Sequence, residues 1–122
     1  MQVDNFHVWR GMNGVELSFK NVQDNGETVS LFLESCLVSA FPTASVATIS
    51  RKLPESCRTH MLYREEGRRP TIRVFLTLKG VIMLLCRIRH QKAQELFEEL
   101  LDIAMGTQSI QPIEDSDTYA DL

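Results

Sequence analysis

Residues 30–54 read SLFLESCLVSAFPTASVATISRKLP and contain two stretches of helical hydrophobic spacing. The first stretch begins at Ser30, and Pro42 ends it because proline cannot continue a helix. Thr43 or Ser45 caps the second stretch, which stops at the proline that closes the quoted sequence. Two short helices joined by a tight turn predict a helix-turn-helix-like pair.

The residues before this pair predict β-structure. Apolar and polar residues alternate at 6–8 and 15–19 around a glycine-containing turn at 11–14, which is the pattern of a hairpin. A second turn at 24–26 leads into a short third strand at 27–29.

Residues 58–76 predict a second hairpin. Alternation at 59–63 and 72–76 flanks a charged turn at 65–69. Arginines crowd this hairpin and its turn, namely Arg64, Arg68, Arg69 and Arg73. A basic hairpin beside two short helices is the arrangement expected of a wing.

The last part of the chain predicts two further helices. Thr77 caps a mostly apolar helix that runs from Leu78 to Ile88, and a break follows near His90. An amphipathic helix then ends at Gly106. Its apolar stripe predicts a core-facing side, although a partner could use the same stripe.

The length of 122 residues fits one domain. We expect a single α+β domain over residues 3–105 and an acidic, disordered tail over 106–122. The longest apolar run, 81–86, is far shorter than a membrane span, and the N-terminus has no signal-peptide pattern. With an odd number of cysteines, three, these features predict an intracellular protein, nuclear or cytoplasmic and not secreted.

Charge is strongly segregated along the chain. Residues 51–92 hold eleven Lys and Arg against three Glu, a net charge of +8. Residues 1–50 carry −3 and residues 93–122 carry −8, which gives −3 for the whole chain. This asymmetry indicates a polyanionic partner, or an acidic tail that shields a basic surface.

We therefore expect a regulatory module of transcription or chromatin that binds double-stranded DNA through the basic segment. The expected contact residues lie on the second short helix, the wing and the next turn: Ser45, Thr48, Arg51, Lys52, Arg64, Arg68, Arg69, Arg73, Arg87 and Arg89. A second interpretation is a protein-interaction module, self-associating or with its basic face against an acidic partner. In a third, the acidic tail folds over the basic face and competes with DNA.

Other chemistry has little support in the sequence. The pairs Cys57 with His60 and Cys86 with His90 have spacings that zinc permits, but Cys86 continues an apolar run. The chain contains no nucleophile elbow, phosphate-binding glycine loop or His-Glu-x-x-His motif. We expect no enzymatic activity, no metal and no cofactor.

Two stretches, 31–53 and 75–97, resemble the Bro-N domain of large DNA viruses and phages, which is grouped with KilA-N. The first is similar to that family's strand and helix pair, and the second to its strand, Gly-Leu-Tyr helix and following helix. The second stretch keeps the family pattern at Gly80, Arg87, Ala93 and Phe97. The resemblance implies a small DNA-binding domain.

The chain also departs from that pattern. Leu31 stands where the family has an aromatic residue, Pro42 replaces a glycine, and no tryptophan follows Phe97. The order of hairpin, Leu-Phe-Leu helix and later wing is also similar to the Ski/Sno/Dac domain of transcriptional co-regulators. Either resemblance implies a module linked to DNA or chromatin.

Overall fold

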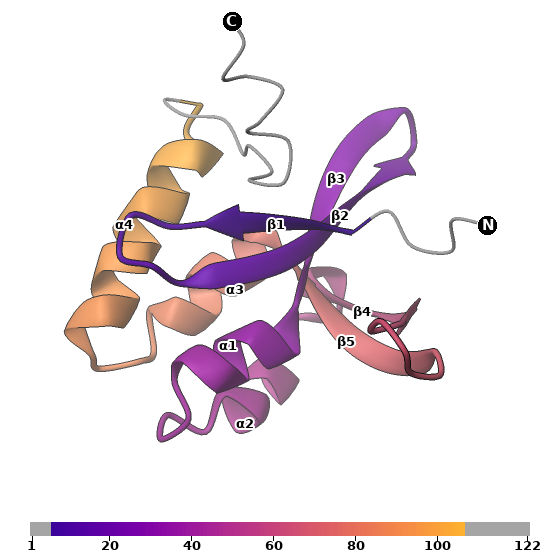
Figure 1. The fold of residues 1–122 in the computed structure, drawn as a ribbon. Coiled ribbons are helices and arrows are strands. Elements are labelled where there is room, and N and C mark those ends of the chain that lie inside the picture. The colour runs from indigo at the N-terminus through magenta and orange to yellow at the C-terminus, as the bar shows by residue number, and fades with distance from the viewer. Residues whose placement is uncertain (1–5, 107–122) are drawn as a thin grey trace, which may run out of the picture.

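A computed structural model describes residues 6–106 as an α+β fold, a five-stranded antiparallel sheet with helices against one face (Figure 1). The strands are β1 (His7–Arg10), β2 (Glu16–Asp24), β3 (Glu27–Leu33), β4 (Arg58–Tyr63) and β5 (Thr71–Thr77). The helices are α1 (Glu34–Ala40), α2 (Val46–Arg51), α3 (Leu78–Leu85) and α4 (Gln91–Ala104), with a 3-10 turn, η1 (Glu55–Cys57). Both predicted hairpins and all four predicted helices are present, and the predicted tail lies outside the described residues apart from Gly106.

The order of the strands is β1-β2-β3-β5-β4, so β3 joins two hairpins. It pairs with β2 along most of its length, from Glu27 to Phe32. It pairs with β5 through three residues only, which are Leu31, Phe32 and Leu33. Beyond this junction the β2–β3 and β4–β5 hairpins diverge, as Figure 1 shows on its right side.

The structure corrects the expected start of the first helix. Leu31 to Leu33 continue β3, and α1 begins only at Glu34. The Leu-Phe-Leu run is buried on both faces of the sheet, so it lacks the alternation that marks a half-exposed strand. Its spacing with the apolar residues of α1 therefore mimicked one longer helix.

The helix ends differ from expectation by a few residues. Ser45 is the N-cap of α2, but its backbone is left-handed, with φ of 54°, and its side chain makes no capping bond. Thr77 caps α3 as predicted, accepting a hydrogen bond from the Gly80 N–H at 3.0 Å. That helix ends at Leu85 rather than Ile88. Helix α4 ends at Ala104, and Gly106 follows it in the left-handed conformation with a φ of 85°.

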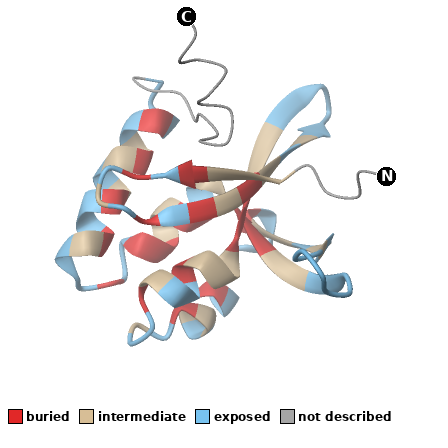
Figure 2. Ribbon diagram, viewed as in Figure 1, coloured by how far each residue is buried: buried red, intermediate tan, exposed pale blue. Residues whose placement is uncertain are grey.

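The sheet packs apolar side chains on both faces. The helix-covered face holds the main core, which includes Leu17, Phe19, Phe32, Leu76, Leu84, Leu96 and Leu100. The other face holds a smaller cluster around Leu31, Leu33 and Phe75, with Phe6, Met61 and Tyr63 packed against it. The hairpin residues therefore alternate between two apolar layers. Figure 2 shows buried segments where the hairpins meet and exposed segments at their tips.

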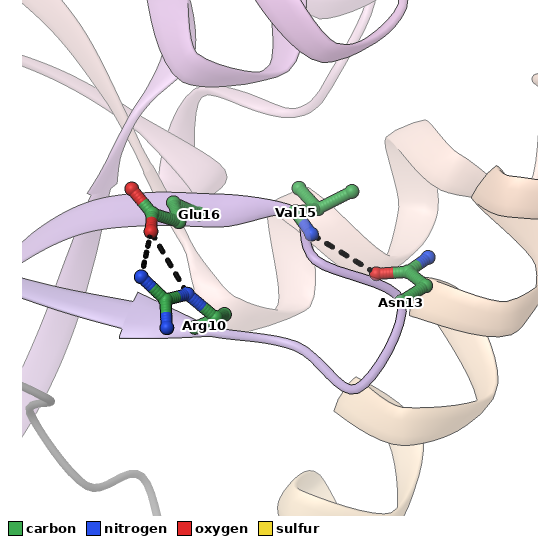
Figure 3. A network of polar contacts seen from close by, with 4 residues as sticks. All are labelled: Arg10, Asn13, Val15 and Glu16. Atoms are coloured by element: carbon green, nitrogen blue, oxygen red, sulfur yellow. Dashed lines mark hydrogen bonds and ion pairs between the residues drawn. The ribbon is translucent and has the colours of Figure 1, made fainter.

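The β1–β2 turn docks onto α4. Asn13 accepts a hydrogen bond from the Val15 N–H at 3.2 Å, and its amide donates to the Lys92 carbonyl at 2.9 Å. Beside the turn, Arg10 Nε donates to Glu16 across the two strands at 2.8 Å (Figure 3). One asparagine thus shapes the turn and fixes it to the start of the last helix.

A largely buried polar contact connects α1, α2 and β4. Arg58 Nε donates to the Ser50 hydroxyl at 3.1 Å, and its Nη2 lies 3.9 Å from Glu34 Oε2. The Arg58 and Glu34 side chains are 21% and 15% exposed. Arg58 therefore attaches the helix pair to the base of the basic hairpin.

Replacing Arg58 alone should be more destabilising than replacing both members of the pair. Arg58→Met leaves the Glu34 carboxylate with little solvent and no cation, so we expect a loss of about 2–3 kcal/mol in unfolding free energy. The double variant Glu34→Met/Arg58→Met should lose less, because no buried charge remains. Urea unfolding followed by circular dichroism measures both. Arg10→Met serves as the control, because the ion pair of Arg10 with Glu16 is exposed. This variant should lower the free energy of unfolding by less than about 1 kcal/mol.

Gly80 is a second sensitive position. A Cβ at this site would lie 2.9 Å from the Cys57 carbonyl oxygen and 3.0 Å from Cys57 Cβ. The Cys57 backbone cannot move away without disturbing the packing around it. Gly80→Ala should therefore destabilise the domain by about 1–3 kcal/mol, despite the better helix propensity of alanine. Lys79→Ala, its exposed neighbour, is the control. A Gly80→Ala protein as stable as the wild type would contradict the close helix–turn packing.

Candidate functional site

The loop of the β4–β5 hairpin carries three exposed arginines. Arg64, Arg68 and Arg69 are exposed, and none forms an ion pair with another residue between 6 and 106. The turn is closed by the Arg68 N–H, which donates to the Glu65 carbonyl at 3.0 Å, and Gly67 adopts a positive φ of 77°. The loop geometry therefore presents these guanidinium groups to solvent.

Arg73 differs from the loop arginines because it has partners. Its Nη2 lies 3.6 Å from Glu65 Oε1, and its Nε donates to the Thr71 hydroxyl at 2.9 Å. Its guanidinium lies 6.0 Å from the centroid of the Tyr63 ring. These residues line a groove of about 220 Å³ together with Arg68 and Arg69. Arg73 thus stiffens the tip of the hairpin.

Helix α2 contributes a second group of polar and basic residues. Val46 and Ser50 face the core, while Thr48, Arg51 and Lys52 are exposed. Arg51 Nη2 lies 3.4 Å from the Thr48 hydroxyl. The buried side of α2 is thereby fixed, and its other side is free to meet a ligand.

The connection between α3 and α4 contributes the third group. Arg87 and Arg89 are exposed there on either side of the buried Ile88. With residues 40–44 they line a pocket of about 340 Å³ between this connection and the α1–α2 turn. The ring of His90 lies 6.0 Å from that of Phe41 across the same contact.

These three groups lie along one border of the molecule, from the hairpin tip at the lower right of Figure 1, through α2, to the α3–α4 connection at the lower left. The Arg58–Ser50 hydrogen bond ties β4 to α2, and the pocket beside Phe41 ties the α1–α2 turn to the connection. We call this border the basic edge. Its cations without an ion pair inside the described part are Arg51, Lys52, Arg64, Arg68, Arg69, Arg87 and Arg89.

Most acidic residues of the described part lie outside these three groups, although Glu95 and Glu98 line a pocket of about 730 Å³ together with Arg89. The outer side of α4 carries Glu95, Glu98 and Asp102, and the tip of the β2–β3 hairpin carries Asp24 and Glu27, all exposed. Acidic residues also occur within the basic edge, in η1 and in the hairpin turn. The charge segregation of the sequence therefore becomes a spatial polarity, with cations in excess along the basic edge.

All ten residues singled out in the sequence lie on this border, at its surface. Ser45 and Thr48 flank the start of α2, and Arg73 is the only one of the ten with an ion pair to a described residue. Sequence reasoning missed the structural role of Arg58, and it missed Tyr63, the aromatic residue that lines the hairpin groove. The pairing register of the hairpin could have identified Tyr63, because this register places it opposite Thr71 and beside Arg73.

The four residues considered as zinc ligands differ in their exposure to solvent. Cys57 is buried, whereas His60, Cys86 and His90 are exposed. Among residues 6–106 no three His, Cys, Asp or Glu side chains come together as a metal ion requires. The His90 ring nitrogen Nδ1 instead accepts a hydrogen bond from the Lys92 N–H at 3.0 Å and caps α4.

No helix within the described part is long and apolar enough to cross a membrane.

Comparisons with known proteins found no matching family model, no matching curated protein and no matching solved structure. The resemblances to the Bro-N and Ski/Sno/Dac domains therefore stay predictions, and the geometry of the basic edge carries the functional argument.

Burial at the groove has a measurable consequence for Tyr63. Partial burial raises the pKa of its phenol above 10.0, while a hydrogen bond with Ser18 acts in the opposite direction. In a Tyr119→Phe background, which leaves Tyr63 as the single tyrosine, phenolate absorbance should therefore appear above pH 10. Because the folded pKa is the higher one, this contribution to stability is complete below pH 10 and is lost as the pH rises through the folded pKa.

Ser18→Ala provides the internal check on that titration. Removing the hydrogen bond that lowers the pKa of Tyr63 should move its midpoint further upward. A midpoint at or below the ordinary tyrosine value would show that the phenol is not buried in the folded protein.

Proposed function

We propose that this domain binds double-stranded DNA along its basic edge and acts as a regulatory module of transcription or chromatin. The observation that supports DNA binding most strongly is the row of cations on three connected elements that form no ion pair with any residue from 6 to 106. Phosphate contacts by such residues release condensed counterions, which supplies affinity without any base recognition. The regulatory role rests on the resemblance of residues 31–53 and 75–97 to the Bro-N domain.

Under this proposal the three elements have different tasks. Arg64, Arg68 and Arg69 contact phosphates from the wing, and Arg87 and Arg89 do so from the α3–α4 connection. Helix α2 lies between them with Thr48 and Arg51 outward, and short hydroxyl and long guanidinium groups suit phosphates and base edges. Arg73 acts mainly by holding the tip, since its charge is already partnered by Glu65.

Neutralising the wing tests the proposal directly. Arg68→Gln/Arg69→Gln should weaken binding to every duplex by a similar factor, because phosphates carry no sequence information. The slope of log K against log salt should fall by about 1.8, corresponding to two lost phosphate contacts. Fluorescence anisotropy of a labelled duplex of about 20 base pairs, titrated at several salt concentrations, measures both quantities.

A matched charge change keeps the result interpretable. Arg10→Gln removes an exposed arginine that lies on β1, away from the basic edge, and should leave the salt slope unchanged. Wild-type protein that fails to bind any duplex at low salt would overturn the proposal and favour the protein-interaction interpretation. Unchanged binding by the double variant would remove the wing from the interface.

A further inference from the structure

The β4–β5 hairpin exposes two large apolar side chains that the core does not use. Leu62 is 59% exposed and Ile72 is 67% exposed. They are direct cross-strand partners, so their side chains lie next to each other on one face of the hairpin. On the same face, the neighbouring cross-strand pair is His60 with Val74, and Val74 packs against the main core. Leu62 and Ile72 extend this apolar face of the hairpin beyond the part that the helices cover.

The surroundings of this pair are cationic. The loop that follows Leu62 and precedes Ile72 holds Arg64, Arg68 and Arg69, and Pro70 is exposed next to them. Glu65 in the same loop is occupied by Arg73, which leaves Glu66 as the loop's unpaired acid among the described contacts. An apolar pair is thus flanked by arginines at the end of a projecting two-stranded ribbon.

We propose that Leu62 and Ile72 form a wedge that enters the minor groove of duplex DNA and partly unstacks one base step, bending the duplex. Proteins that bend DNA from the minor groove insert Leu, Ile or Pro side chains between base pairs while arginines contact the groove and its phosphates. The cross-strand pair forms one apolar unit about 5 Å across, a size suited to an opened step. This inference rests on the proposed DNA binding and adds to it a mode of recognition.

Charge and area favour DNA over a second copy of the chain at this surface. Two copies meeting through the pair would bring their sets of loop arginines together, and like charges repel. Two side chains also offer far less area than the roughly 800 Å² per partner of a stable protein interface. A duplex meets the same surface with complementary charge.

The mode of recognition predicts a preference for deformable sequence. Pyrimidine–purine steps such as TA unstack most easily, whereas runs of adenine are stiff. A duplex with a central TA step should therefore bind more tightly than one of equal length with a central A-tract. The preference arises from the energy of deformation and requires no hydrogen bond to a base.

The test uses the full chain and a TA duplex of about 20 base pairs that carries a fluorophore pair at its ends and 2-aminopurine at the central step. Wild-type binding should raise energy transfer between the ends and brighten the 2-aminopurine as it unstacks. Leu62→Thr/Ile72→Thr should bind about tenfold more weakly and give neither signal. Its salt slope should match that of the wild type, because the phosphate contacts remain.

Controls separate the wedge from folding and from DNA binding itself. Threonine keeps strand propensity, so circular dichroism and the urea midpoint should be unchanged. Met12→Thr, which replaces an even more exposed apolar residue on the β1–β2 turn, should leave binding and bending unchanged. Salt-dependent binding without bending, or bending retained in the double variant, overturns the wedge and leaves DNA binding standing. A wild-type dimer that the double variant converts to monomer overturns it in favour of self-association. Absence of any binding overturns the proposed function.

Discussion

The arrangement of the whole domain depends on the short junction between β3 and β5. Three residues, Leu31 to Leu33, pair with Phe75 to Thr77 and unite two otherwise separate hairpins into one sheet. These residues are buried on both faces, so the junction holds the two apolar layers together. Its shortness matters equally, because a longer β3–β5 ladder would confine the β4–β5 hairpin within the sheet. The brief pairing leaves the outer half of that hairpin projecting, as the proposed role of a wing requires.

The same junction explains how the cations are divided between structure and surface. Arg58 lies at the base of the hairpin, where the helices pack, and it is drawn into contact with Glu34 and Ser50. Farther out, no helix covers the ribbon, and the loop arginines find no carboxylate to pair with in the described part. Distance from the β3–β5 junction therefore decides whether a basic residue of this segment holds the fold together or remains available to a ligand.

Much of the fold could be predicted from the sequence, because most elements are half-buried and so leave a periodic signal. Alternation located both hairpins, and Thr77, Pro42 and Gly106 located helix ends. The Leu31–Leu33 segment failed because burial on both faces removes periodicity. The site was predictable only as a set of surface residues. The sequence does not show that Arg58 faces the helices. It also does not show that Leu62 and Ile72 lie beyond the part of the hairpin that the helices cover. Both facts depend on how α1 and α2 pack against the sheet.

An exposed apolar residue on an edge strand favours association with other chains, and the loop arginines oppose this association. β4 is the last strand of the sheet, so its outer backbone groups could pair with another chain, and Leu62 would strengthen such pairing. Charged residues at the end of an edge strand oppose this association by repulsion. The loop arginines thus have two physical effects, attraction of a polyanion and protection of the edge. Neutralising them would weaken both, and for that reason the oligomeric state of every charge variant has to be known before its affinity is interpreted. Bound DNA would satisfy the cations and cover the apolar pair at once, so both features of the hairpin favour the same partner.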